Sequence, residues 1–322
     1  MNEVQKYLEY TIPREDSVYC VEFCSSENCS QLLGVGTEAK VSIYQLKFKD
    51  DDDDVDDFEF EQLYDFQNGC RVTAIAWSPE SSLVSLPKLL RLAVAGSDRR
   101  IRVFSTDLKG DDSVQVLEGH TDFVNSLTFD PDSGTQLASV GDDQWCRIWD
   151  RDGNQQLAFP LGAPGMSVCW HREEPMKVMV ALKTGVIKIF SLTQEEQLMS
   201  FEAGPGPLME ADWSAGNKGL LIGAACGQEF VMFDVSVSSR PVERRQIHVE
   251  GTRHFRWAKC SDSLVATVGR PGRQIKVFNS KHQQTPITIS QPITYTVSWH
   301  QRLPVLAAGG DQKVHVYCFD AL

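Results

Sequence analysis

Short runs of alternating apolar and polar residues recur along the whole chain, and each run ends at an aromatic residue. Alternation with a period of two is the pattern of a β-strand that buries one of its faces. The run-ending aromatics lie 41 to 54 residues apart, and a second aromatic follows each of them 18 to 27 residues later. The first set is Phe23, Trp77, Phe129, Trp170, Trp213, Trp257 and Trp299, and the second is Tyr44, Phe104, Trp149, Phe190, Phe233, Phe278 and Tyr317. The chain therefore contains seven repeats.

Each repeat can be divided into strands and turns. In the third repeat we predict strands at residues 124–129, 136–140 and 146–150, and in the fourth at 166–170, 178–182 and 186–190. Turn-forming residues, chiefly Gly and Asp, separate the second and third strands of most repeats, as at residues 141–143. Repeats of this length and pattern are typical of the blades of a WD40 propeller. The sequence thus predicts an all-β fold, a seven-bladed WD40 β-propeller, over residues 1–322 as a single domain.

The last repeat is one strand short, because the chain stops after its third strand. Residues 6–12 have strand composition and belong to no repeat of their own. Pairing them with the last blade would close the ring and cover an open sheet edge. We therefore predict that the N-terminal strand closes the propeller.

Two long repeats contain insertions that we expect to form surface loops, where added length costs little. The first insertion, at residues 47–62, is acidic, and the second repeat carries extra residues at 81–88 and 109–112. The net charge of the chain is −13, and nine carboxylates at positions 50–61 account for most of it, since −13 + 9 = −4. The remaining surface is nearly balanced, which argues against nucleic acid as a direct partner.

Composition also bears on the compartment and on cofactors. The chain has nine cysteines without framework spacing, so we expect free thiols and no disulfides. Cys20, Cys24 and Cys29 lack the further ligands of a zinc site, and we predict no metal and no cofactor. No apolar run is long enough to span a membrane, and the first residues do not resemble a secretory signal. We therefore expect no membrane insertion.

The third repeat carries the motif that is most specific to WD40 proteins. Gly119 and His120 precede it, and residues 138–150 read ASVGDDQWCRIWD. This stretch resembles a complete WD40 repeat. The resemblance implies a structural hydrogen-bond network inside the blade, formed by four residues: His120, Ser139, Asp143 and Trp149. Asp98 and Asp311 match the turn aspartate in the second and seventh repeats.

Several stretches outside this motif are similar to the nucleoporin 37 family, the small WD40 subunits of the Y-shaped scaffold in the outer rings of the nuclear pore. They are VTAIAWSPE at 72–80, SLP at 85–87, LEGHTDF at 117–123, PGMSVCWH at 164–171, FRW at 255–257, SWH at 298–300, LP at 303–304 and GGD at 309–311. The resemblance implies a scaffold role in the nucleus, at the nuclear envelope and pore complex. It also implies attachment to nucleoporin 160 in the Y-complex, participation in mRNA export and protein import, and a place at the kinetochore in mitosis.

Motifs for enzyme chemistry are missing from the sequence. It contains no phosphate-binding glycine loop, no nucleophile elbow and no metalloprotease motif, so we predict that the protein is not an enzyme. His171 and His300 each follow a blade tryptophan, where a structural or rim position is expected. Function must then depend on surfaces that bind proteins.

Arginines mark the candidate partner surface, because this residue is enriched at interface anchors. We select Arg99, Arg100 and Arg102, and note further clusters at Arg240, Arg244 and Arg245 and at Arg253, Arg256, Arg270 and Arg273. An alternative function is that of a substrate receptor for a cullin-type ubiquitin ligase. Such receptors generally carry Trp-Asp-x-Arg at the end of a blade, whereas here Trp149 and Asp150 are followed directly by Arg151.

Overall fold

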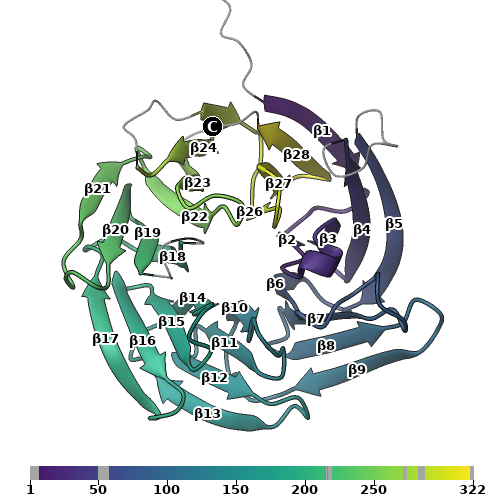
Figure 1. The fold of residues 1–322 in the computed structure, drawn as a ribbon, viewed down its shortest axis with the longest axis horizontal. Helices are drawn as coiled ribbons and strands as arrows, with labels where there is room; N and C mark the ends of the chain where they lie inside the picture. The colour runs from purple at the N-terminus through teal and green to yellow at the C-terminus, as the bar shows by residue number, and fades with distance from the viewer. Residues whose placement is uncertain are drawn as a thin grey trace, which may run out of the picture.

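The computed structural model describes residues 7–49, 58–214, 216, 220–270, 274–281 and 287–319. These residues form seven four-stranded antiparallel sheets, arranged around an axis like the blades of a propeller (Figure 1). Blades 1 to 3 are β2(Cys20–Phe23), β3(Leu32–Gly36), β4(Lys40–Phe48) and β5(Phe58–Gln67); β6(Val72–Trp77), β7(Leu90–Gly96), β8(Ile101–Thr106) and β9(Asp112–Leu117); and β10(Val124–Phe129), β11(Leu137–Gly141), β12(Trp145–Trp149) and β13(Gln155–Pro160).

Blades 4 to 6 are β14(Gly165–Trp170), β15(Lys177–Leu182), β16(Val186–Ser191) and β17(Glu196–Glu202); β18(Leu208–Trp213), β19(Leu221–Cys226), β20(Glu229–Asp234) and β21(Glu243–Gln246); and β22(Gly251–Trp257), β23(Leu264–Arg270), β24(Gln274–Asn279) and β25(Ile287–Ser290). Blade 7 consists of β26(Thr296–Trp299), β27(Val305–Gly309), β28(Lys313–Phe319) and the N-terminal strand β1(Tyr7–Pro13). A single turn of 3-10 helix, η1(Glu27–Cys29), lies between β2 and β3.

The predicted fold class is confirmed, including the closure of the ring. Strand β1 pairs antiparallel with β28 in continuous register from Tyr7 opposite Phe319 to Pro13 opposite Lys313. The closing strand ends one residue later than the predicted 6–12, and Lys6 lies outside the described residues. The extent of the domain over the whole of 1–322 stays a prediction.

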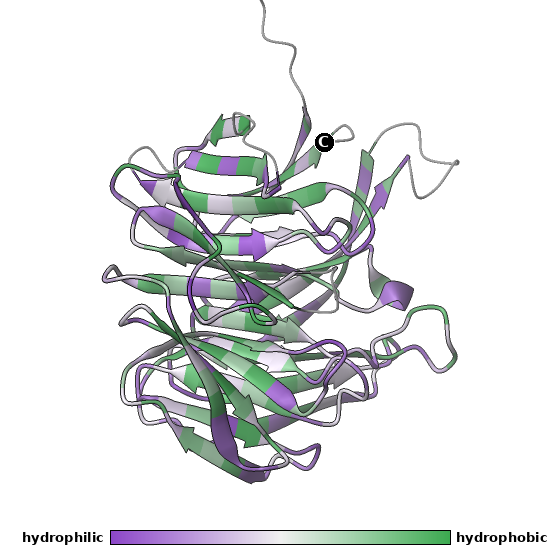
Figure 2. Cartoon of the chain, turned by 60° about the vertical axis from the view of Figure 1, so that its left-hand side comes forward, coloured by the Kyte–Doolittle hydropathy of each residue, from purple (hydrophilic) through white to green (hydrophobic). Residues whose placement is uncertain are grey.

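Seven apolar clusters hold the ring together, one between each pair of neighbouring blades. The run-ending aromatics of the first strands lie inside these clusters, and Trp257 is fully buried. Gly223 in β19 makes room for this packing, because a Cβ atom there would lie 2.4 Å from Phe255 and 2.6 Å from Trp257. Each blade is thus buried mainly by its neighbours, as the repeat pattern predicts. Figure 2 shows the alternation of hydrophobic and hydrophilic residues along the strands.

The antiparallel order of the strands divides the loops between two faces of the ring. The connections from the first to the second strand and from the third to the fourth strand of each blade lie on one face, which we call the insertion face. The hairpins between second and third strands lie on the other, the turn face. The connections that contain η1, residues 78–89 and residues 107–111 all lie on the insertion face, which is turned to the right in Figure 2.

The acidic insertion is shorter than the predicted 47–62. Strand β4 continues to Phe48, and β5 begins opposite it at Phe58, so Glu59 and Glu61 are strand residues rather than loop residues. The physical reason is the alternating sequence Phe58, Glu59, Phe60, Glu61, which has the period of a strand. Residues 50–57 lie outside the described residues.

Candidate functional site

The four residues assigned to the network of blade 3 lie together. His120 Nδ1 is 2.8 Å from Asp143 Oδ2, and His120 Nε2 is 2.7 Å from Ser139 Oγ. The indole N–H of Trp149 donates to the same Ser139 Oγ at 2.8 Å. Although burial raises the pKa of Asp143, hydrogen bonds from His120 and from backbone amides hold that pKa below its ordinary value. Asp143 therefore accepts from His120 Nδ1, which leaves Nε2 to accept from the Ser139 hydroxyl.

This arrangement satisfies all four side chains but offers no reactive atom. The side chains of His120 and Asp143 are 1% and 0% exposed, so a substrate cannot reach them. Ser139 is fully buried as well and uses its hydroxyl proton within the network. A buried polar network with every member paired stabilises and specifies a fold. Its chemistry is structural, as the WD40 resemblance implies.

The turn aspartates of the other blades differ from each other. In blade 2 the guanidinium of Arg102 donates to both carboxylate oxygens of Asp98, at 2.6 and 3.2 Å. In blade 7 Asp311 is exposed. All three turns nevertheless place the residue after the aspartate in the left-handed region, with φ of 69° at Arg99, 65° at Gln144 and 51° at Gln312. The shared turn geometry thus does not require the same side-chain contacts.

Asp98→Asn is expected to remove a pH-dependent part of the stability. Burial raises the pKa of Asp98, but the hydrogen bonds from Arg102 outweigh this effect, and the pKa falls from 3.8 to about 2. Because the pKa of Asp98 is lower in the folded than in the unfolded protein, its ionised form stabilises the fold at pH values above about 4, the pKa of the unfolded state. This contribution disappears as the pH falls toward 2. Urea unfolding of both proteins should give the largest difference at pH 5 to 7 and a shrinking one below pH 4. A difference that stays constant down to pH 3 would contradict the assignment.

A second histidine network, in blade 6, was missed by the sequence analysis. His248 Nε2 lies 3.0 Å from Thr267 Oγ1, and the two residues are 19 positions apart. The same spacing separates His120 from Ser139. His248 is 2% exposed, and burial followed by the charge of Lys276 lowers its pKa to about 4. The spacing of 19 residues between a histidine and a residue with a hydroxyl group, shared with blade 3, could have identified this pair in the sequence.

Blades 4 and 6 have no turn aspartate, and a lysine of their third strand bonds to a backbone carbonyl instead. Lys188 Nζ donates to the carbonyl of Leu161 at 2.9 Å in blade 4, and Lys276 Nζ donates to that of Ile247 at 2.5 Å in blade 6. Both lysines occupy the third strand at the position that Arg102 and Arg147 hold in blades 2 and 3. In blades 2, 3, 4 and 6, a basic side chain of the third strand therefore contacts an acceptor in a turn or connection of the turn face.

The arginines selected as a partner surface do not form one patch. Arg102 is 15% exposed and is bound to Asp98, so its guanidinium is already used within the blade. Arg100 is half exposed and pairs with Glu118 at 2.8 Å, while Arg99 donates to the carbonyl of Thr121 at 3.1 Å. Of the three selected arginines, Arg99 and Arg100 therefore remain as candidate contacts on the turn face. Sequence proximity could not reveal this difference, because Arg99 and Arg100 lie in the turn before β8 whereas Arg102 lies within that strand, within reach of Asp98.

The other arginine clusters are also divided. Arg244 pairs with Glu229 at 3.0 Å, and Arg245 pairs with Glu243 and lies over the ring of Phe278. Arg256 faces the axis of the ring, whereas Arg240 and Arg270 are exposed. Arg273 lies outside the described residues. These clusters therefore provide no common surface.

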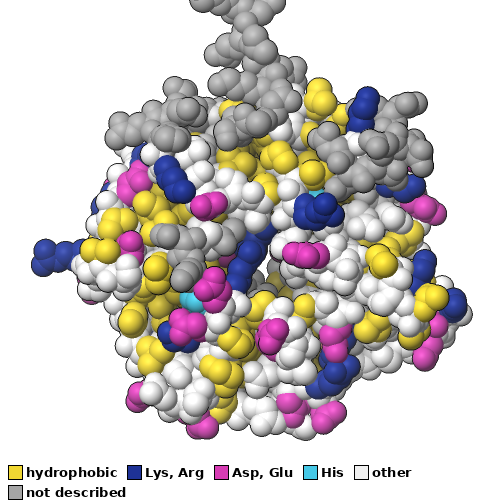
Figure 3. All heavy atoms as spheres, viewed as in Figure 1, with side chains coloured by type: hydrophobic (Ala, Val, Ile, Leu, Met, Phe, Trp, Pro, Cys, Tyr) yellow, Lys and Arg dark blue, Asp and Glu magenta, His cyan; other side chains and the backbone are white. Residues whose placement is uncertain are grey.

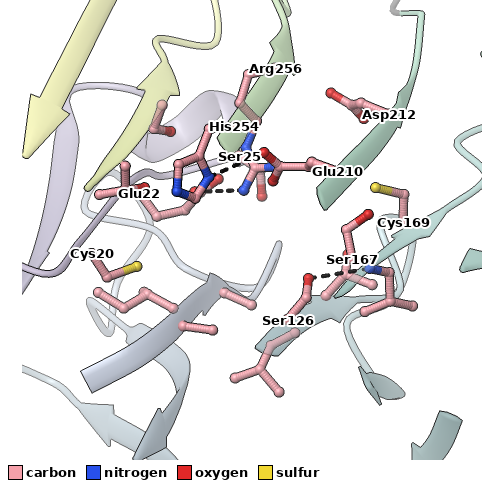
Figure 4. A pocket seen from close by; sticks show the side chains of 18 of the residues that line it. Cys20, Glu22, Ser25, Ser126, Ser167, Cys169, Glu210, Asp212, His254 and Arg256 are labelled. Atoms are coloured by element: carbon pink, nitrogen blue, oxygen red, sulfur yellow. Dashed lines mark hydrogen bonds and ion pairs between the residues drawn. The ribbon is translucent and has the colours of Figure 1, made fainter. Parts of the chain in front are cut away.

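A cavity of about 420 Å³ lies on the axis and is lined by the first strands of all seven blades. Figure 3 shows the ring hollowed at this point, with a Lys or Arg side chain in the opening. Arg256 forms ion pairs with Glu210 of the neighbouring blade and, at 3.9 Å, with Glu22 of blade 1 (Figure 4). Lys259 pairs with Asp212 at 3.0 Å. The charges inside the cavity are thus largely paired with each other.

Polar side chains in the cavity join neighbouring blades through backbone amides. In five such bonds a side-chain oxygen accepts from a backbone amide of the next blade: Ser298 from Phe23 N at 3.0 Å, Ser126 from Val168 N at 3.2 Å, Ser167 from Ala211 N at 3.1 Å, Glu210 from Phe255 N at 2.8 Å and Asp212 from Trp257 N at 3.3 Å. Because each residue links one blade to the next, this belt reinforces the ring. The sequence signal was a polar residue inside an otherwise apolar first strand.

Burial keeps the two thiols and one histidine of the cavity in their neutral forms. Burial raises the pKa of Cys20 and Cys169 to about 12, so both remain thiols and are poor nucleophiles. Burial, with Arg253 nearby, lowers the pKa of His254 to about 4. All nine cysteines are free, and within the described residues no group of three potential metal ligands converges. The described part of the chain also contains no helix with the length and apolar character needed to span a bilayer.

His171 and His300 are structural turn residues. Each is buried, and its Nδ1 accepts hydrogen bonds from the backbone amides two and three positions later, at 3.3 and 3.0 Å for His171 and at 3.2 and 3.0 Å for His300. The alternative of a rim-exposed position is wrong for both. These histidines fix the turns after their blade tryptophans.

Comparison with known proteins shows similarity well beyond the repeat. The WD domain, G-beta repeat family matches residues 60–105 and 111–150. The chain is 39% identical to nucleoporin Nup37 of Mus musculus and 40% identical to that of Homo sapiens, each over 310 residues and 95% of both chains. It is 32% identical to nucleoporin Nup37 of Drosophila melanogaster over 312 residues, again 95% of both chains. The similarity therefore extends through all seven blades.

Proposed function

Because this chain belongs to the Nup37 family of nucleoporins, we propose that it is a structural, non-catalytic subunit of the nuclear pore Y-complex. In this role it binds nucleoporin 160 and supports pore assembly, protein import and mRNA export at the nuclear envelope. Through the same complex it acts at kinetochores during mitosis. The similarity to nucleoporins over 95% of the chain is the observation that carries the proposal.

The geometry of the ring favours a scaffold over an enzyme. The blade 3 histidine is enclosed, the cavity thiols are protonated, and Arg256 and Lys259 pair with carboxylates inside the cavity. A rigid disc of this kind offers two faces and an outer edge for protein contacts. Binding through such surfaces requires no reactive centre.

The alternative function, a cullin-type substrate receptor, is less favoured by the contacts at the end of blade 3. Asp150 accepts hydrogen bonds from the backbone of Asn154 at 2.7 Å and from Gln156 at 2.6 Å. Arg151 pairs with Glu80 of the preceding blade at 2.9 Å. These two side chains are therefore engaged within the propeller itself.

Affinity purification of the tagged full chain, followed by quantitative mass spectrometry, tests the proposal. We expect Y-complex nucleoporins, including nucleoporin 160, at near-equal stoichiometry. Recovery of cullin adaptors in their place would overturn it in favour of the alternative.

Arg99→Glu with Arg100→Glu tests whether the turn face of blade 2 takes part. Reversing two exposed charges at an interface should lower nucleoporin recovery about tenfold, with a steeper loss at low salt. The matched control is Lys183→Glu with Arg240→Glu, which makes the same charge change at two exposed positions on other blades. If both double variants recover nucleoporins as well as the unmodified protein does, this patch is excluded while the scaffold role stays intact.

A further inference from the structure

The insertion face of blade 2 carries a loop, residues 81–89, whose tip exposes aliphatic side chains. We propose that the tip of this loop inserts into an apolar pocket of a protein partner, and that basic residues surround that pocket. The inference rests on the proposed scaffold function and adds to it a second contact surface, opposite the face that carries Arg99 and Arg100. We call this loop the blade 2 knob.

The base of the knob is held by several hydrogen bonds. Ser82 and Leu89 form a two-way backbone bridge, at 2.7 and 2.9 Å. Ser81 Oγ donates to the carbonyl of Arg91 and accepts from its amide, both at 3.0 Å. Ser85 N donates to Ser82 Oγ at 3.0 Å. A loop fixed in this way loses little conformational freedom when it binds, which favours association.

The tip presents apolar side chains to solvent in spite of this rigid base. Val84 is 77% exposed and Leu86 is 82% exposed, the two highest values among the large hydrophobic side chains described. Leu83, between base and tip, instead packs against the apolar cluster of blades 1 and 2. Single exposed aliphatics are common on protein surfaces, but two on one pinned projection form a preorganised contact.

Two segments that pack beside the base of the knob carry carboxylates. Cys29 of η1 and Leu108 of the β8–β9 connection belong to or pack against the same apolar cluster as Leu83. These two segments carry the exposed Glu27 and Asp111 and the half-buried Asp107, and none of the three forms an ion pair with another described residue. Lys88 and Lys109 are the exposed cations of the two loops. The local balance is therefore negative.

Charge complementarity then defines the partner. An excess of carboxylates over lysines, −3 + 2 = −1, beside an apolar tip favours a surface that carries Lys or Arg around its pocket. The same carboxylates oppose an anionic membrane surface and a nucleic-acid backbone. A protein partner is the occupant that fits both the apolar tip and the acidic surroundings.

The test uses the tagged full chain with Val84→Ser and Leu86→Ser together. Removing two aliphatic side chains from a filled pocket should lower recovery of the bound nucleoporins at least about tenfold. The matched control is Val237→Ser with Val242→Ser, two aliphatics that are 72% and 48% exposed on the β20–β21 connection of blade 5. Thermal melting of both purified variants should match the unmodified protein, since none of the four side chains is buried.

A second arm locates the partner surface. The photo-crosslinking substitution Leu86→p-benzoylphenylalanine should join the knob to an apolar patch bordered by Lys or Arg on a nucleoporin. Crosslinks to a patch without basic residues, or to phospholipid, would overturn the inference, as would flotation of the purified protein with vesicles that is lost in Val84→Ser/Leu86→Ser.

The two proposals fail in different ways. Full recovery of nucleoporins by the knob variant, with no crosslink from position 86, would overturn the knob contact and leave the scaffold function standing. If the unmodified protein itself recovers no nucleoporins, the scaffold function is overturned, and the knob contact with it.

Discussion

Ile12→Ala is expected to lower the free energy of unfolding by roughly 2–5 kcal/mol, the usual cost of truncating a fully buried isoleucine. Ile12 is 0% exposed in the closing strand, where it pairs with Val314 and packs in the apolar cluster between blades 7 and 1. The substitution leaves a cavity at the point where the ring closes. Equilibrium unfolding in urea, followed by tryptophan fluorescence, measures the difference.

Leu8→Ala is the matched control, because Leu8 belongs to the same strand but is 58% exposed. Its effect should stay within about 0.5 kcal/mol, as for most surface substitutions. Equal losses from Ile12→Ala and Leu8→Ala would mean that the closing strand does not support the ring through its buried face.

Ser139→Ala is the second substitution with a large expected effect, a loss of roughly 2–6 kcal/mol in the free energy of unfolding. Ser139 Oγ serves two buried partners, the imidazole of His120 at 2.7 Å and the indole N–H of Trp149 at 2.8 Å. Without the hydroxyl both partners lose a hydrogen bond inside the blade, and each unsatisfied buried group costs about 1–3 kcal/mol. The same urea titration provides the measurement.

Blade 6 supplies the control for this prediction, because Thr267 holds the equivalent position beside His248. Ser139→Thr keeps the hydroxyl and should recover most of the stability that Ser139→Ala loses. If Ser139→Thr is as damaging as Ser139→Ala, volume rather than hydrogen bonding determines the effect at this site.

The blade count and the ring closure could be predicted because both depend on patterns that run along the chain. The aromatic residues of the first strands mark every inter-blade cluster, so their spacing reports the number of blades directly. The strand at Tyr7–Pro13 was recognisable because it had strand composition and no blade of its own. In each case the information is local to a short segment.

Contacts between blades could not be predicted in the same way. Glu210 and Arg256 are 46 positions apart, and Glu22 is farther still, so only the ring brings their charges together. The arginine cluster at 99–102 shows the reverse case, since neighbours in sequence serve different purposes in the fold. Side-chain direction and cross-blade distance, rather than residue type, decide these roles.

The pairing of β1 with β28 has a consequence for synthesis of the chain. Glu9 and His315, which lie 2.9 Å apart across this pair, are separated by 306 residues. Strand β1 is synthesised long before its partner and must therefore wait until Lys313–Phe319 has been made, and contacts of such long range form slowly. Until then β1 has no partner and β27 can pair only with β26, so a chain that stalls before β28 would expose unpaired strand edges to aggregation and quality control.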